Sequence, residues 1–181
     1  MISNPMMGDP NFERSIIFLC EHGNQGSLGF VLNKPAKVAL NEIVEGFDDV
    51  SLPIYVGGPV EQNTLHFIYH IDGQGPLAEP LESSNQIGEN IYMGGSFDRL
   101  RDIFNLYTLE EGQIKFFVGY SGWSEGQLEK EIEENSWVVV KSPHVSNIFE
   151  NTNRVHWKDM MSGLGGRYKM MANYPVDPRL N

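Results

Sequence analysis

Residues 116–132 read FFVGYSGWSEGQLEKEI, and here an apolar run passes through two glycines into a charged segment. Aromatic and β-branched side chains over residues 114–119 predict a strand. Leu128 and Ile132 lie four residues apart among acidic side chains, as on the buried face of an amphipathic helix over residues 124–135. The sequence therefore predicts a strand that leads into a helix, with the glycines at the junction.

The junction between strand and helix has the composition of a tight turn. Gly119 and Gly122 allow the backbone to bend sharply. Ser124, with Gln127 three residues later, has the spacing of a capping box, so we expect the helix to begin at Ser124. Free N–H groups at such a turn and the positive end of a helix dipole would attract an anion or a polarised carbonyl. The alternative is that the glycines only form the corner and that Trp123 only packs.

A nucleophile elbow is a different interpretation of the same residues. That motif requires a glycine two positions before and two positions after the serine. Gly119 stands correctly before Ser121, but the second glycine comes one position early and Trp123 takes its place. A hydrolase or acyl-transfer enzyme using Ser121 or His22 is therefore the alternative to a non-enzymatic protein, and it needs a histidine within hydrogen-bond reach of Ser121.

The rest of the chain predicts hairpins and loops with helices inserted irregularly. Residues 14–20 and 27–33 form a predicted hairpin around the polar segment EHGNQG. Ser96 is the predicted N-cap of a helix whose apolar residues recur at helical spacing. Residues 73–90 lack apolar periodicity and predict a long surface connection. The other predicted strands are residues 54–56, 64–71, 91–93 and 137–140, and the other predicted helices are residues 40–44, 143–149 (opened by Pro143) and 155–161.

This order of elements and the length of the chain predict one α+β domain. No βαβ rhythm occurs, so the sheet should be mainly antiparallel. The 181 residues suit a single domain over residues 1–181, in which the proline-bearing tail from about residue 167 is extended. The sequence carries no signal for an oligomeric state.

Charge and cysteine content limit the kinds of function that this protein can have. The 13 basic and 24 acidic residues give a net charge of −11, which makes direct nucleic-acid binding unfavourable over most of the surface. Cys20 is the single cysteine, so no intrachain disulfide can form. No segment approaches the roughly 18 apolar residues that span a bilayer, and the N-terminus lacks the pattern of a signal peptide. We therefore expect a cytoplasmic protein without a membrane partner.

Three separated motifs resemble the AlgH/YqgE-type family of bacterial proteins: EHGNQGSLGFVLNKP, then YVGGPV, then GYSGWSEGQLEKEIEENSWVV, followed by a short helix with HWKDMM. The resemblance covers residues 2–166. It implies a single cytosolic α+β domain with a partly folded-over, barrel-like sheet, and no established enzymatic activity or cofactor. Part of the family carries a transcriptional-regulator label, and in this family the place of Ser121 is commonly held by a small residue such as Ala. The family's recurrent residues correspond to Phe12, Arg14, Glu21, His22, Gly29, Asn33, Pro35, Gly57, Gly58, Pro59, Gly119, Trp123, Gly126, Gln127, Leu128, Glu131 and Trp137.

The favoured interpretation is a non-enzymatic binding or regulatory protein whose pocket accepts a small anionic ligand or a partner protein. Three glycine-bearing strand ends and a capped helix supply the candidate pocket. Its residues are His22, Asn33, Gly57, Gly58, Pro59, Gly119, Ser121, Gly122, Trp123 and Gln127. No metal site is predicted, because His66 and His70 would lie about 13 Å apart along one strand.

Overall fold

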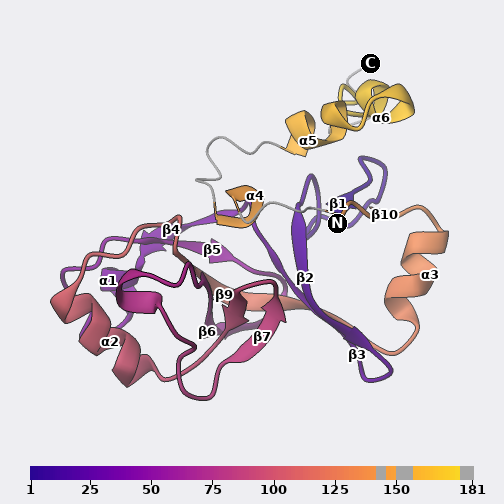
Figure 1. The fold of residues 1–181 in the computed structure, drawn as a ribbon. Coiled ribbons are helices and arrows are strands. Elements are labelled where there is room, and N and C mark those ends of the chain that lie inside the picture. Colours follow the sequence, from indigo (N-terminus) through magenta and orange to yellow (C-terminus); the bar gives the residue numbers. More distant parts are fainter. Residues whose placement is uncertain (142–145, 150–156, 176–181) are drawn as a thin grey trace.

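The structure is a computed structural model that describes residues 1–141, 146–149 and 157–175 (Figure 1). Its strands are β1 (Ile2–Ser3), β2 (Ile17–Gly23), β3 (Gly26–Val31), β4 (Pro35–Ala39), β5 (Pro53–Val56), β6 (Val60–His70), β7 (Asn85–Gly88), β8 (Ile91–Met93), β9 (Ile114–Trp123) and β10 (Trp137–Val138). Its helices are α1 (Leu40–Ile43), a 3-10 turn (Gly75–Leu77), α2 (Phe97–Leu106), α3 (Gln127–Glu133), α4 (Ser146–Phe149), α5 (Trp157–Gly163) and α6 (Gly166–Met171).

The strands form a mainly antiparallel sheet that curls into a nearly closed barrel. The order β2-β3-β9-β6-β8-β7 is antiparallel throughout, and β5 adds a parallel pairing with β9 while β4 pairs with β5. The end strands β2 and β7 contact each other, which brings the two edges of the sheet together. The predicted α+β class with a barrel-like sheet is therefore confirmed.

The helices lie on different sides of this sheet, each over its own apolar cluster. Figure 1 shows α1 and α2 on one side and α3 on the opposite side, with α5 and α6 beside β1 and β10. Leu40, Leu100 and Phe116 belong to the cluster beneath α1 and α2. Trp123 and Leu128 belong to the cluster beneath α3. The predicted inner face of α3 is thus confirmed at Leu128.

Strand β9 crosses the middle of the sheet and is longer than predicted. It does not turn at Gly119 but continues to Trp123, and its last residues pair with β3. Gly119 has φ +66, a left-handed backbone that redirects β9 from β6 and β5 toward β3. The prediction of a turn over residues 119–123 was wrong, because the glycine bends a strand here instead of ending it.

Helix α3 begins three residues later than the capping-box spacing predicted. Gly126, with φ +74, precedes its first residue, Gln127. Half of the predicted box is present, since Gln127 Oε1 accepts the Ser124 N–H at 3.1 Å. The Ser124 hydroxyl donates to the same oxygen at 3.0 Å and does not accept a backbone N–H, so Ser124 belongs to the turn before the helix.

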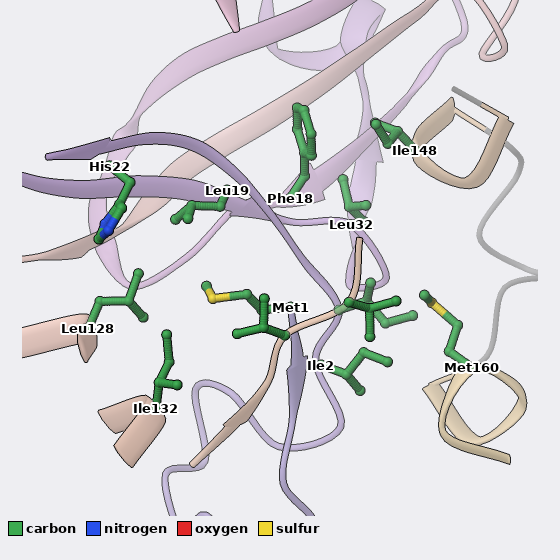
Figure 2. A pocket seen from close by; sticks show the side chains of 13 residues that line it. Met1, Ile2, Phe18, Leu19, His22, Leu32, Leu128, Ile132, Ile148 and Met160 are labelled. Atoms are coloured by element: carbon green, nitrogen blue, oxygen red, sulfur yellow. The ribbon is translucent and has the colours of Figure 1, made fainter. Parts of the chain in front are cut away.

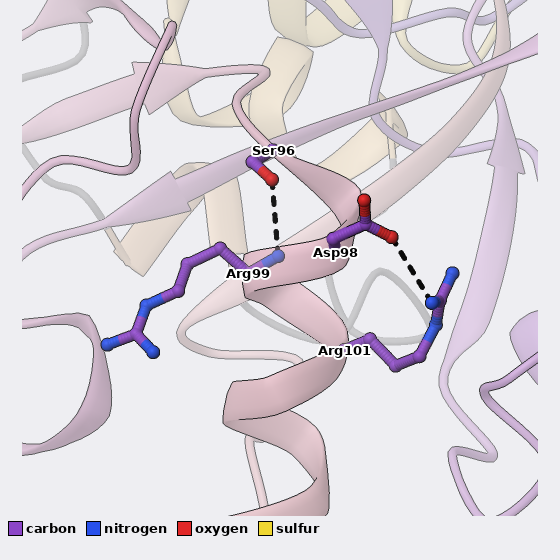
Figure 3. A network of polar contacts seen from close by, with 4 residues as sticks. All are labelled: Ser96, Asp98, Arg99 and Arg101. Carbon is purple, nitrogen blue, oxygen red and sulfur yellow. Dashed lines mark hydrogen bonds and ion pairs between the residues drawn. The ribbon is translucent and has the colours of Figure 1, made fainter.

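Helix α2 begins where the sequence predicted. The Ser96 side chain accepts the Arg99 N–H at 3.2 Å, as an N-cap does (Figure 3). In the first turn, the Asp98 carboxylate accepts a hydrogen bond from the Arg101 guanidinium. The apolar face of α2 then packs through Leu100 and Ile103, which are buried. The capping prediction is confirmed.

Several other boundaries differ from the predictions. The hairpin turn contains two residues, because β2 and β3 run on to Gly23 and Gly26. The predicted surface connection over residues 73–90 contains β7, an edge strand whose Asn, Gln and Gly residues carry no apolar signal. Strand β10 is the first half of the strand predicted over residues 137–140, whereas its partner β1, which has two residues, was not predicted.

The tail is partly helical where the sequence predicted an extended segment. Helix α6 covers Gly166–Met171, and Tyr168 and Met171 pack against the apolar cluster that includes Ala172. This packing outweighs the neighbouring glycines and prolines on which the prediction rested. The helix opening at Pro143 and the start of the last helix at Val155 fall outside the described residues.

In the part of the chain that the structure describes, every helix is too short or too polar to cross a bilayer.

Candidate functional site

An apolar pocket of about 360 Å³ lies between β2, α3, the segment after β10, and helices α4 and α5 (Figure 2). The polar end is marked by His22, close to Leu128 and Ile132, and the other end by Ile148 and Met160. Pockets of roughly 300–1,000 Å³ are typical of small-ligand sites. The lining residues are Met1, Ile2, Ile16, Phe18, Leu19, His22, Leu32, Leu128, Ile132, Val139, Val140, Ile148 and Met160.

The sequence dictates this lining through three short patterns. Residues 16–19 are an unbroken apolar run at the start of β2, so side chains on both faces of the strand are apolar. Leu128 and Ile132 lie one helical turn apart and face the same way from α3. Val139 and Val140 continue the chain beyond β10. An aliphatic wall therefore arises from segments that are far apart in the chain.

His22 is the one predicted site residue that lines this pocket. Its Nδ1 lies 2.8 Å from the Ser27 hydroxyl, and its Nε2 lies 3.8 Å from Glu129 Oε1. His22 and Ser27 are directly paired across the β-hairpin, which explains the first contact. The imidazole is 47% exposed and so can still reach a ligand at the mouth of the pocket.

The predicted residues at 57–58 and 119–121 meet in a tight backbone crossing. The Ser121 hydroxyl is fully buried and donates to the Gly57 carbonyl oxygen at 2.9 Å. A Cβ on Gly57 would lie 2.3 Å from the Gly119 carbonyl oxygen, and one on Gly58 would lie 2.3 Å from the Tyr120 carbonyl. These glycines therefore allow the segment after β5 to approach β9 closely. The predicted motifs at 57–58 and 119–121 meet there through tightly packed backbone.

Pro59 and Gly122 flank this crossing and lie away from the pocket wall. Pro59 is exposed between β5 and β6, and Gly122 pairs with Leu28 in the sheet. The Asn33 side chain links the segment after β3 to the segment before β2. Its Oδ1 accepts the Ile16 N–H at 2.8 Å, and its Nδ2 donates to the Arg14 carbonyl at 2.8 Å. The side chain of Asn33 is thus used in holding the start of β2.

Trp123 and Gln127 converge on one carboxylate, that of Glu131. Trp123 Nε1 donates to Glu131 Oε2 at 2.9 Å, and Trp137 Nε1 donates to the same oxygen at 2.8 Å. Gln127 Nε2 donates to the other oxygen at 2.9 Å. Phe12 packs against both indoles, at centroid distances of 6.1 and 5.3 Å. This network fixes α3 to the sheet and thereby positions the helical wall of the pocket.

Sequence reasoning missed most of the pocket. Phe18, Leu32 and Met160 carry no feature that distinguishes them from ordinary core residues, and they meet only in the folded chain. One signal was present, because the helical face of Leu128 and Ile132 was predicted correctly. What lies opposite that face depends on how α3 is placed.

Lys115 is a buried charge outside the pocket. It is 1% exposed, its amine lies 4.2 Å from the centre of the Tyr55 ring, and it donates to the Ile148 carbonyl at 3.4 Å. Burial lowers the pKa of Lys115 from 10.5 to about 8, and the negative charge of Glu111 opposes this shift. Desolvation is therefore the dominant effect on this amine.

Burial also shifts the pKa values of Cys20 and His66. Burial raises the pKa of the Cys20 thiol, with a smaller contribution from Glu21, so the sulfur stays protonated and poorly nucleophilic. Burial also lowers the pKa of His66, whose Nε2 lies 2.8 Å from the Thr64 hydroxyl. Across residues 1–141, 146–149 and 157–175, no three His, Cys, Asp or Glu side chains are grouped as metal ligands.

Comparison with known proteins places this geometry in a family. A UPF0301 protein of Cytophaga hutchinsonii is 38% identical over 181 residues, with 100% of this chain and 96% of that protein covered. A UPF0301 protein of Parabacteroides distasonis is 40% identical, with 100% of this chain and 89% of that protein covered.

Two solved structures are similar in fold. The solution structure of AlgH from Pseudomonas aeruginosa has a TM-score of 0.68 at 28% identity and covers 96% of this chain and 91% of that one. A crystal structure of a Corynebacterium diphtheriae protein has a TM-score of 0.75 at 20% identity and covers 96% of this chain and 89% of that one. A profile of the AlgH-like family matches residues 1–169, and the chain therefore belongs to the AlgH-like family.

Proposed function

We propose that this protein is a binding protein that holds an apolar group of its ligand or partner in the pocket beside β2. The observation that carries the proposal is the lining: among its described residues, His22 has the one titratable side chain, and the others are aliphatic, aromatic or methionine. Burial of apolar surface contributes roughly 25 cal/mol per Å², so such a pocket favours an apolar group over a charged one.

The charges at the mouth support a neutral or cationic polar group over an anion. Glu129 lies 3.8 Å from His22, and Glu125 and Glu133 are exposed on or beside the same helix. The whole chain carries a net charge of −11. An anionic ligand would meet repulsion at this end of the pocket, whereas a hydroxyl, an amide or an ammonium group would not.

The surroundings of Ser121 favour binding over acyl-transfer chemistry. A serine nucleophile needs an accessible hydroxyl with a histidine as its base. The Ser121 hydroxyl is fully buried and donates to a backbone carbonyl. A regulatory role of this protein would act through a bound ligand or protein partner, because its net charge disfavours DNA.

A titration with 1-octanol tests the proposal. In protein labelled at Ile, Leu and Met methyl groups, we expect saturable shifts at Leu19, Ile132 and Met160. Ile132→Trp should fill the pocket and abolish the shifts, whereas Lys130→Trp, on the exposed face of the same helix, should leave them unchanged. Equal binding by both variants, or shifts confined to other methyl groups, would refute the proposed site.

A further inference from the structure

In the part of the chain that the structure describes, no strand forms a ladder with the outer edge of β2 beyond Ile17, although β7 lies close to β2. In the described part of the chain, β3 is the ladder partner of β2 over Ile17–Gly23. Ile17 directs its backbone groups away from β3, because its N–H donates to the Met1 carbonyl at 2.8 Å. Antiparallel strands alternate between inward and outward backbone groups. Allowing for the register shift between Leu19 and Glu21, the outward positions that follow are Leu19 and His22.

The outer edge of β2 borders the apolar pocket. Leu19 and His22, whose backbone groups point outward, both line the pocket. Phe18, the neighbour of Leu19 on the other face of the strand, lines it too. Across from this edge, Val139 and Val140 provide an aliphatic wall. An object in the pocket therefore meets apolar side chains together with backbone groups that have no ladder partner among the described residues.

The N-terminal residues already pair with the start of this edge of β2. Met1 and Ile17 exchange backbone contacts, and Ile2 forms an isolated antiparallel bridge with Ile16. Among the described residues no further pairing follows on this edge, and β2 continues past the pocket to His22. From Ile17 to His22 a strand spans about 17 Å, which is room for about five residues of a second strand.

We propose that the natural occupant is an extended segment of a partner protein that adds a strand to β2, an inference that rests on the proposed function. Strand addition combines backbone hydrogen bonds with pockets for alternate side chains. Here the backbone partners are Leu19 and His22, and the apolar pocket takes the side chains that alternate toward it. A peptide satisfies both features of the site, whereas an alkyl chain satisfies one.

The charges select the chemistry of the segment. Glu129 lies at the His22 end of the pocket and is 52% exposed, so its carboxylate can receive a cation. A basic residue at one end of the segment would be attracted there, as complementary charges at an interface set the register of a partner. The partner is therefore an apolar, β-branched segment flanked by Lys or Arg.

The test uses the acetylated hexapeptide amide KVTVTV and two versions that are N-methylated at alternate residues, one at odd and one at even positions. In an added strand, alternate N–H groups face β2, so one methylated version should lose roughly tenfold or more in affinity and the other should bind as the parent does. We expect amide shifts of Leu19 and His22 in labelled protein. Equal binding by both methylated peptides overturns strand addition.

Two controls separate this inference from the proposed function. Octanol binding without peptide binding overturns the strand and leaves the apolar site intact, whereas loss of both refutes the site itself. Glu129→Lys should weaken the peptide and leave octanol unchanged, while the remote exposed substitution Glu110→Lys should change neither. A dimer in sedimentation that the peptide fails to dissociate would assign the edge to a second copy and overturn the partner peptide.

Discussion

Glu131→Ala is the substitution that most directly tests how α3 is held on the sheet. The Glu131 carboxylate accepts both indole N–H groups, from Trp123 at 2.9 Å and from Trp137 at 2.8 Å, and the amide of Gln127 at 2.9 Å. The two indoles are 5% and 3% exposed. Removing the carboxylate therefore leaves two buried donors without their acceptor.

The size of the effect follows from these contacts. A hydrogen bond to a charged group contributes about 1.5–3 kcal/mol, and a buried donor left unpaired costs about 1–3 kcal/mol. The two indoles share one oxygen, so their contributions are not additive. We expect Glu131→Ala to lower the free energy of unfolding by about 3 kcal/mol, a large part of the roughly 5–15 kcal/mol typical of a domain.

Urea unfolding followed by tryptophan fluorescence and circular dichroism measures this loss. Glu131→Gln should recover part of it, because its amide oxygen can still accept an indole N–H. Glu133→Ala, at an exposed position of the same helix, is the matched control and should change stability by less than about 0.5 kcal/mol. A loss below about 1 kcal/mol for Glu131→Ala would refute the claim that this carboxylate anchors α3.

Three other measurements test the fold. Gly119→Ala should lower the free energy of unfolding by about 2 kcal/mol or more, because the residue has φ +66 and its Cβ would lie 2.6 Å from the Val60 carbonyl oxygen. Gly112→Ala is the control, since a Cβ there would have nothing within 4 Å, and it should leave stability nearly unchanged in the same urea titration. Ser96→Ala should cost about 1 kcal/mol by loss of the α2 cap, and an effect near zero would contradict the capping role. Lys115, with a pKa lowered from 10.5 to about 8 in the folded state, binds fewer protons there than in the unfolded chain between these pH values. Stability relative to Lys115→Met should therefore rise by up to about 3 kcal/mol from pH 8 to 10.5, and a constant difference in urea unfolding across this range would refute the buried charge.

Local patterns predicted those elements whose signals are complete within a few residues. The cap at Ser96, the strand over residues 91–93 and the apolar face of α3 all follow from spacing alone. The strand β7 and the helix α6 were missed because pairing with β8 stabilises β7 and packing on an apolar cluster stabilises α6. In both cases the local residues are polar or interrupted by glycine, so no periodic signal exists.

The residues of the candidate site also fall into those that the sequence predicted and those that it did not. The sequence prediction included His22, which lines the apolar pocket, but it grouped His22 with the glycines at 57 and 119, which pack against each other. A glycine that ends a strand and a glycine that lets two strands cross look alike in sequence. The difference lies in what the missing Cβ would meet, and that depends on the neighbouring strand.

The sequence by itself determined the α+β class, the family resemblance, the net charge of −11 and the buried face of α3, because each depends on composition or on short-range spacing. Tertiary structure alone decided that β9 bends at Gly119 and continues to Trp123, that Ser121 is buried, and that the edge of β2 borders an apolar pocket. The physical reason is that a pocket is a relation between surfaces. Residues 16–22, 128–132 and 139–140 each supply one wall, and it is the network at Glu131 that holds α3 opposite β2.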